Sequence, residues 1–141
     1  MTVKEIYAFL DKIAPFGSAR STDNCGLLVG DPDAAVKKAA VVLDVTPEIL
    51  DEASRKGVTL IISHHPIIYT PLRALSAGTP AFSAARSGIN VICAHTNLDI
   101  APGGVNDCFI GALGFDKLGS VEGTDGCAAL CRCPESFSEP G

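Results

Sequence analysis

The most informative segment of this chain is Val58-Thr59-Leu60-Ile61-Ile62-Ser63-His64-His65-Pro66. Its first six residues form a nearly continuous apolar run, which is typical of a strand buried on both faces of a sheet. Pro66 favours extended backbone at His65, because a proline disfavours the helical region for the residue before it. The stretch therefore predicts a central strand that ends in two adjacent histidines.

Strand and helix patterns alternate on either side of this stretch. Short apolar runs predict further strands at residues 25–29, 39–43 and 89–94. Helices are predicted at residues 3–14, 46–57, 79–88 and 105–113, with start signals such as Thr46-Pro47 and end signals such as Gly57. Strands that alternate with helices indicate an α/β fold, with a mostly parallel sheet and helices packed on it.

Candidate metal ligands follow the predicted strands. His64 and His65 come after the strand at 58–63, His95 comes after the strand at 89–94, and Asp99 lies four residues further on. Ligands of open parallel α/β sheets bind beyond the carboxyl ends of the strands. Nitrogen and carboxylate ligands suit zinc, iron or manganese. The sequence thus predicts a metal site with His64, His65 and Asp99 as ligands, and His95 as a catalytic residue that moves protons or completes the ligand set.

The two adjacent histidines favour two metal ions over one. Neighbouring side chains of an extended chain leave on opposite faces, so His64 and His65 can each hold one ion of a pair separated by roughly 3.5–4 Å. Asp99 would supply a carboxylate that bridges the ions. Two alternatives stay open: the histidines are ordinary polar residues at strand ends, or they act with carboxylates as acid–base groups without a metal. Asp44, after the strand at 39–43, can also serve only to satisfy backbone donors of a helix.

Several segments resemble the amino-terminal half of the NIF-three-like family of dinuclear metal proteins, often labelled GTP cyclohydrolase I type 2. They are residues 23–30, 42–47, 62–69 with the His64-His65-Pro66 motif, and 94–99 with His95-Thr96-x-x-Asp99, followed by 103–107. The resemblance implies that residues 1–119 form a NIF-three-like α/β unit and that His64 and His65 bind different ions, with Asp99 shared between them. It also places His95 in or directly behind the ligand set, and implies a ring-shaped homo-oligomer, commonly a homohexamer.

The end of the chain departs from that family. Family members complete the site with a His-x-x-x-Glu pair near the carboxyl terminus, whereas no histidine follows His95 here. The remaining glutamates, Glu122, Glu135 and Glu139, lie in a Cys-, Gly- and Pro-rich tail at residues 120–141. We expect the chain to be incomplete, with this tail as the start of a missing continuation. A natural short form would instead have a site that is open, completed by another chain, or inactive.

The cysteines indicate reduced thiols more than a second metal site. Cys127, Cys131 and Cys133 lack the paired spacing of structural zinc sites and are interpreted as part of a strand. Cys25, Cys93 and Cys108 lie in apolar surroundings and are expected in the core. Six cysteines without a secretory leader predict a cytoplasmic protein.

Composition limits the partners. A net charge of −5 with scattered Lys and Arg argues against nucleic acid, and no apolar stretch approaches membrane-spanning length. Charged residues make up only 19% of the chain, which leaves apolar surface for the missing half or for a neighbouring subunit.

Two classes of function follow. The first is a metal-dependent hydrolase that acts on a phosphorylated or nucleotide-like small molecule, with GTP as a candidate by resemblance only, since no nucleotide-binding motif is present. The alternative is a non-catalytic, metal-binding or regulatory oligomeric scaffold, or an inactive fragment.

Overall fold

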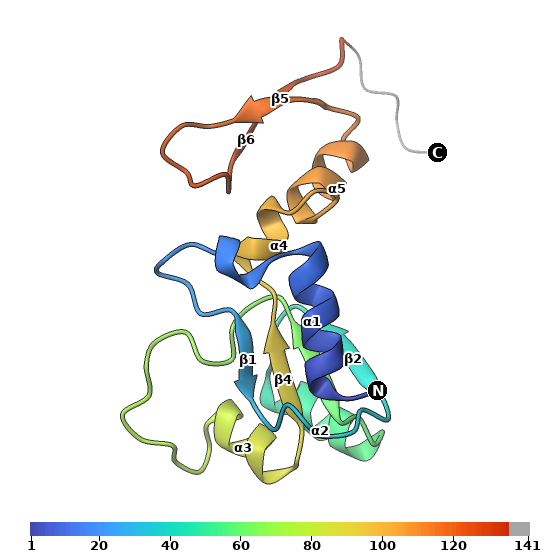
Figure 1. Ribbon diagram of the computed structural model, residues 1–141, viewed down its shortest axis with the longest axis vertical. Helices are drawn as coiled ribbons and strands as arrows, with labels where there is room; N and C mark the ends of the chain where they lie inside the picture. Colours follow the sequence, from blue (N-terminus) through green and yellow to red (C-terminus); the bar gives the residue numbers. More distant parts are fainter. Residues whose placement is uncertain (136–141) are drawn as a thin grey trace.

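The computed structural model of the chain describes residues 1–135 and contains a four-stranded main sheet. The strands lie in the order β1 (Gly26–Val29), β4 (Asn90–Cys93), β3 (Leu60–Ser63) and β2 (Ala39–Val42). β2, β3 and β4 run parallel, and β1 pairs with β4 in the antiparallel direction. The predicted α/β fold with a mostly parallel sheet is therefore confirmed, with one edge strand reversed (Figure 1).

The reversal of β1 follows from the connection between β1 and β2. Residues 30–38 contain no helix, although β1 and β2 lie at opposite edges of the sheet. Because the two strands run in opposite directions, β1 ends at the side of the sheet where β2 begins, about 14 Å away across three strand spacings. An extended residue covers up to about 3.3 Å, so residues 30–38 span this distance without a helical crossover. The reversal also brings the residues before β1 to the side where β2, β3 and β4 end.

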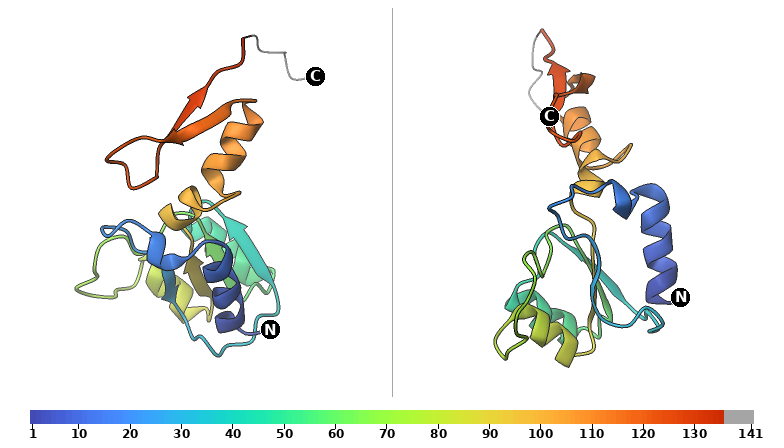
Figure 2. Two further views of the ribbon diagram at one scale, coloured as in Figure 1. Left: turned by 45° about the horizontal axis from the view of Figure 1, so that its top comes forward. Right: turned by 60° about the vertical axis from the view of Figure 1, so that its left-hand side comes forward.

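Helices cover both faces of the sheet. Helix α1 (Val3–Ile13) lies on one face, while α2 (Pro47–Arg55) and α3 (Pro80–Arg86) lie on the other (Figure 2). Strand alternation divides the core between these faces: Leu60 and Ile92 are buried in the cluster beside α1. Ile61 and Val91 are buried in the cluster beside α2 and α3. The apolar run that is typical of a doubly covered strand thus has a helix layer on each side.

The predicted start signals of α2 and α3 are confirmed as helix caps. The hydroxyl oxygen of Thr46 accepts a hydrogen bond from the Ile49 N–H group at 3.3 Å, and that of Thr79 accepts one from Phe82, also at 3.3 Å. Gly57 follows α2 with a φ of 68°, a left-handed conformation that a glycine adopts at little cost.

The last third of the described chain projects from the sheet. Helix α4 (Thr96–Ile100) comes shortly after β4, with His95 as its N-cap residue, and the sequence did not predict it. It is succeeded by α5 (Val105–Ala112) and the antiparallel pair β5 (Asp116–Ser120) and β6 (Ala129–Arg132) (Figure 1). β6 confirms the strand predicted around the late cysteines. A short 3-10 helix, η1 (Phe16–Ser18), packs against α4.

We call α5, β5 and β6 the arm. The β5–β6 hairpin spans the predicted boundary between residues 119 and 120. The division of the chain into two units at this boundary stays a prediction. Glu139 lies outside the described residues. Apolar side chains on the arm are exposed, with Phe109 at 67% and Leu130 at 56%. Cys108 is also exposed, so its predicted place in the core is wrong: it lies on α5, a helix with no buried residue.

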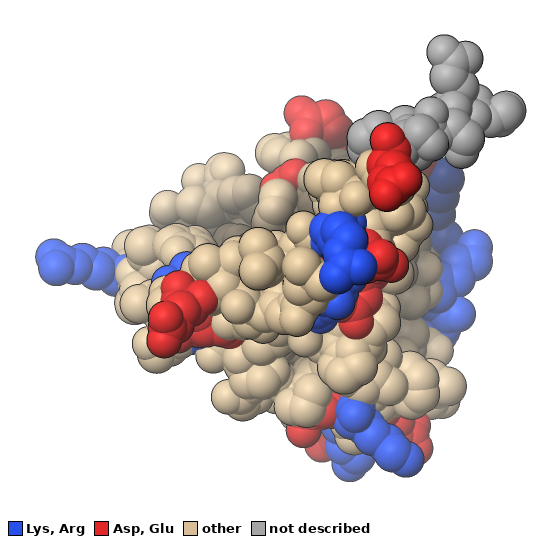
Figure 3. Space-filling model, turned by 90° about the horizontal axis from the view of Figure 1, so that it is seen from above, with Lys and Arg blue, Asp and Glu red and all other residues tan. Residues whose placement is uncertain are grey.

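Charge is scattered over the face of the molecule at the arm end. Seen from the arm end, Lys and Arg lie interspersed with Asp and Glu, between wide areas that carry no charged residue (Figure 3). This face offers no continuous basic surface of the kind that phosphate backbones require. Within residues 1–135, no helix combines the length and apolar character needed to cross a bilayer.

Candidate metal centre

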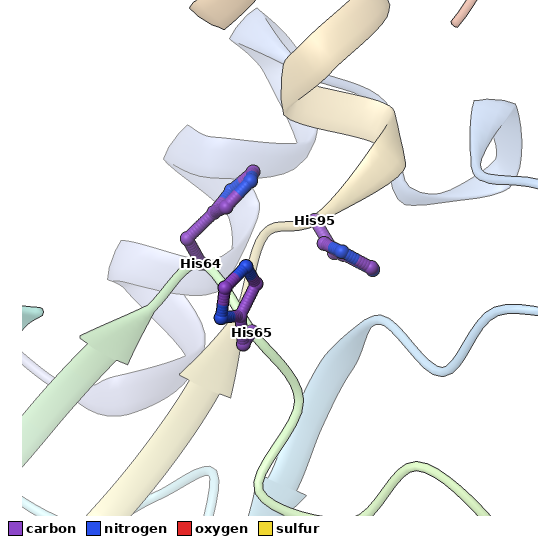
Figure 4. Close-up of side chains that lie close together, drawn as sticks. All are labelled: His64, His65 and His95. Carbon is purple, nitrogen blue, oxygen red and sulfur yellow. The ribbon is translucent and has the colours of Figure 1, made fainter. Parts of the chain in front are cut away.

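The three histidines meet at the edge where the parallel strands end. His64 and His65 follow β3, and His95 follows β4 at the N-cap position of α4 (Figure 4). The ring centroids lie 5.1–5.6 Å apart, and one nitrogen from each ring falls within 4.8 Å of the others. The structure therefore brings together His64, His65 and His95 as a group that could hold a metal ion.

Backbone pairing fixes the adjacent histidines. The His64 N–H group donates to the Val42 carbonyl at 3.0 Å, and the His65 N–H group donates to the Leu43 carbonyl at 2.8 Å. The two rings nevertheless lie 5.2 Å apart at 41°, and not on opposite faces as predicted. β3 ends at Ser63, so the strict alternation of a strand does not govern the two residues that follow.

A hydrogen bond anchors the Nδ1 atom of each ring. His64 Nδ1 lies 3.1 Å from the Ala94 carbonyl oxygen, and His65 Nδ1 lies 2.7 Å from Asp44 Oδ1. Carbonyl and carboxylate oxygens only accept, so each Nδ1 atom carries a proton, and in the neutral ring Nε2 then has the free lone pair. Metal-binding histidines are held in this way, by a carbonyl or carboxylate behind the ring. The donor set therefore fits a divalent transition metal.

Asp99 lies beside the group of three. Its Oδ1 atom is 3.4 Å from His64 Nε2, and its side chain is 21% exposed. Asp99, the predicted carboxylate ligand, thus lies next to His64 Nε2, and the other ring nitrogen of His64 bonds to the Ala94 carbonyl. His95, predicted as a catalytic residue, occupies the same kind of position as His64 and His65, and its role in catalysis stays a prediction.

Asp23 belongs to the site, although sequence reasoning gave it no role. The reversed β1 brings it to this edge, where both of its carboxylate oxygens lie 2.9 Å from His95 Nδ1. Thr96 donates to Asp23 Oδ2 through its hydroxyl at 2.6 Å and its N–H group at 3.2 Å. The side chain is only 3% exposed. Burial alone would raise the pKa of Asp23, but the hydrogen bonds from Thr96, His95 and Cys25 outweigh it and hold the pKa well below its usual range.

Two thiols contact residues of the candidate centre. Cys25 Sγ is 3.2 Å from Asp23 Oδ2, and Cys93 Sγ is 3.1 Å from the His64 carbonyl oxygen. The interaction between the thiols lowers the pKa of Cys25 and, together with burial, raises the pKa of Cys93. The Ser63 hydroxyl, opposite Cys93 in the register, is buried and has no hydrogen-bond partner among the described residues.

Comparison with known proteins now identifies the relatives of this chain. The sequence model of a family described as Duf34/NIF3 (NGG1p interacting factor 3) matches residues 1–139. A Staphylococcus aureus protein named GTP cyclohydrolase 1 type 2 homolog is 40% identical over 124 residues, which are 86% of this chain and 34% of that protein. A Clostridium acetobutylicum protein of the same name is 36% identical over 121 residues, 83% of this chain and 45% of that protein.

Solved structures give the same picture. A Staphylococcus aureus crystal structure superimposes with a TM-score of 0.79 at 37% identity, over 86% of this chain and 41% of that one. Reduced HcgD from Methanocaldococcus jannaschii gives a TM-score of 0.76 at 33% identity, over 82% of this chain and 48% of that one. The chain therefore spans less than half the length of the relatives it matches here.

Proposed function

The chain belongs to the Duf34/NIF3 family, and from this premise we propose that it contributes the strand-edge ligands of a two-metal centre that hydrolyses a phosphorylated or nucleotide-like small molecule. One observation carries the proposal: one nitrogen from each of three imidazole rings lies within 4.8 Å of the others, and an oxygen atom anchors the Nδ1 atom of each ring. Such anchoring at Nδ1 leaves the Nε2 atom of each ring as the candidate metal ligand. The ions would be zinc, iron or manganese.

Each site residue has a distinct task in this proposal. His64, His65 and Asp99 would hold the two ions, with the two histidines on different ions, and Asp99 Oδ1 lies 3.4 Å from His64 Nε2. His95 completes the ligand set or accepts a proton from the attacking water, while Asp23 keeps the His95 Nδ1 atom protonated. Two bound ions would polarise the substrate oxygen and lower the pKa of a water molecule.

The site is open enough for a small molecule. The side chains of His64 and His95 are 20% and 22% exposed, and that of His65 is 45% exposed. GTP is the candidate suggested by the name of the relatives, GTP cyclohydrolase 1 type 2 homolog.

Self-association is part of the same proposal. We expect the complete protein to form a homo-oligomer, a hexamer by resemblance, and exposed apolar side chains on the arm support a covering partner. Light scattering coupled to size exclusion tests this for the 141-residue chain.

Elemental mass spectrometry and a hydrolysis panel test the central proposal. The 141-residue chain and its His65→Ala variant are compared for metal per chain and for turnover of GTP and a phosphate ester. We expect metal content and turnover to fall together in the variant. Bound metal without turnover on any substrate would favour the non-catalytic scaffold, and equal metal content in both proteins would remove His65 from the centre.

A further inference from the structure

We propose that Arg20 binds the phosphate group of the substrate beside the candidate metal centre, and that Asp125 competes with this phosphate for the guanidinium group. The inference rests on the proposed function for the place of the substrate, and it adds the residue that recognises the phosphate. It follows from two contacts that place Arg20 beside the histidines, from unused donors of its side chain and from the charge of the centre.

The backbone of Arg20 is tied to the centre. Its N–H group donates to Thr96 Oγ1 at 3.1 Å. The same hydroxyl donates to Asp23 Oδ2 at 2.6 Å, and Asp23 in turn holds His95 Nδ1 at 2.9 Å. Thr96 also follows His95 directly in the chain. Arg20 therefore lies on the side of the centre where His95 lies.

The side chain of Arg20 is held by the loop between β5 and β6, which lies above the segment that precedes β1 (Figure 1). Arg20 Nε lies 3.4 Å from Asp125 Oδ2. The next residue, Gly126, packs on α4, since a Cβ atom at this position would lie 3.6 Å from Ile100 Cγ2. Ile100 follows Asp99, the predicted carboxylate ligand. This second contact therefore places the guanidinium group near the part of α4 that carries Asp99.

The pair with Asp125 leaves most donors of the guanidinium group unused. No hydrogen bond joins the two side chains, and within residues 1–135 the Arg20 side chain has no other ion-pair partner. The two side chains are 49% and 67% exposed, so the pair adds little stability. A guanidinium group has five donors in a planar fork that matches two phosphate oxygens. A phosphate can therefore displace the Asp125 carboxylate.

The charge of the centre requires a further cation. Two divalent ions would bring four positive charges, and the carboxylates of Asp23, Asp44 and Asp99 bring three negative ones. A phosphate monoester carries about two negative charges near pH 7, which leaves one negative charge without compensation. Arg20 supplies the missing positive charge.

NMR titration of the Zn²⁺-loaded 141-residue chain with guanosine monophosphate and with guanosine tests the proposal. Arg20→Ala should weaken binding of the monophosphate about tenfold, as for a lost hydrogen bond between charged groups, and should leave guanosine binding and zinc content unchanged. Asp125→Asn removes the competing anion and should strengthen binding of the monophosphate by up to about fivefold.

Arg86→Ala is the matched control. Arg86 is the last residue of α3, at the edge where β4 begins, and its substitution should leave binding of both ligands unchanged. The urea unfolding curve of Arg20→Ala should match that of the wild type, because the side chain is half exposed and the backbone bond to Thr96 remains.

Equal affinity of Arg20→Ala and the wild type for guanosine monophosphate, with zinc bound to both, would overturn the inference. An equal loss of affinity for guanosine would also overturn it, since guanosine has no phosphate. A wild-type chain that binds no zinc would instead contradict the proposed function. The titration of the metal-free chain then decides on Arg20: weaker binding of the monophosphate by Arg20→Ala supports its role, and equal binding, or none by either protein, overturns it.

Discussion

Asp23→Asn tests whether a buried carboxylate behind His95 shapes the centre. The substitution keeps the size of the side chain and replaces one acceptor oxygen with an NH₂ donor. Oδ1 accepts from the Asn24 N–H group at 2.8 Å, and Oδ2 accepts from the Thr96 N–H group at 3.2 Å. Whichever way the amide is turned, its NH₂ group faces one of these fixed backbone donors. At least one buried hydrogen bond is therefore lost.

The structure sets the size of the two expected effects. A hydrogen bond to a charged group contributes about 1.5–3 kcal/mol, so the free energy of unfolding of the metal-free chain should fall by about 2 kcal/mol. Loss of a partner behind a metal ligand typically costs about 10–100-fold in affinity, or about 1.4–2.7 kcal/mol. Isothermal titration with Zn²⁺ measures the second effect, and urea unfolding measures the first.

Asp44→Asn is the matched control. Asp44 holds the Nδ1 atom of His65 at 2.7 Å, as Asp23 holds that of His95, but its side chain is 55% exposed and makes one side-chain hydrogen bond among the described residues. The asparagine oxygen can still accept from His65, and an exposed pair contributes about 0–1 kcal/mol. Equal weakening of Zn²⁺ binding by Asp44→Asn and Asp23→Asn would contradict this role of Asp23, and so would an Asp23→Asn variant with unchanged affinity and stability.

Three further predictions concern the free energy of unfolding. Leu60→Ala, at a fully buried position of β3, should lower the free energy of unfolding by about 2–5 kcal/mol, whereas Leu118→Ala on the exposed arm should change it by less than about 0.5 kcal/mol in the same urea titration. Thr46→Ala removes the cap of α2 and should lower the free energy of unfolding by about 1 kcal/mol, whereas Thr46→Ser keeps a hydroxyl oxygen there and should retain most of the stability. Asp23 has a folded pKa below its unfolded value of about 3.9, so its stabilisation is complete above that value and is lost as the pH falls through the folded pKa. Between about pH 5 and pH 2, the wild-type chain should therefore lose more stability than Asp23→Asn, and parallel curves would contradict this account.

The sequence predicted those parts of the fold whose signals are local. The apolar run that ends in His64 and His65 identified the central strand, and Thr46-Pro47 marked a helix start that the structure confirms. Helix α4 was not predicted, because a helix of five residues shows little periodicity and begins at His95, which carries no side-chain cap. The exposure of Cys108 was missed because a local apolar pattern does not distinguish a helix face in the core from an exposed one.

The sequence predicted only those residues of the candidate centre that follow the parallel strands. Strand ends that share a direction meet at one edge, and this rule predicts that His64, His65 and His95 lie together. The same rule places the start of β1 at the opposite edge, and therefore hides Asp23. The geometry of the rings also differs from the prediction, because alternation ends where β3 ends.

Strand direction is the information that a four-residue apolar run does not contain. Gly26–Val29 reads the same in a parallel and in an antiparallel sheet, yet its direction decides whether Asp23 lies beside His95 or far from it. The signal that distinguishes the two is the connection that follows, since a parallel crossover needs a dozen or more residues, usually with a helix. Residues 30–38 contain Pro32 and show no helical periodicity. A connection of this kind predicts a reversed edge strand, and a reversed edge strand brings the residues before it into any site at the carboxyl edge. The short connection at residues 30–38 is thus the sequence signal that could have placed Asp23 beside His95.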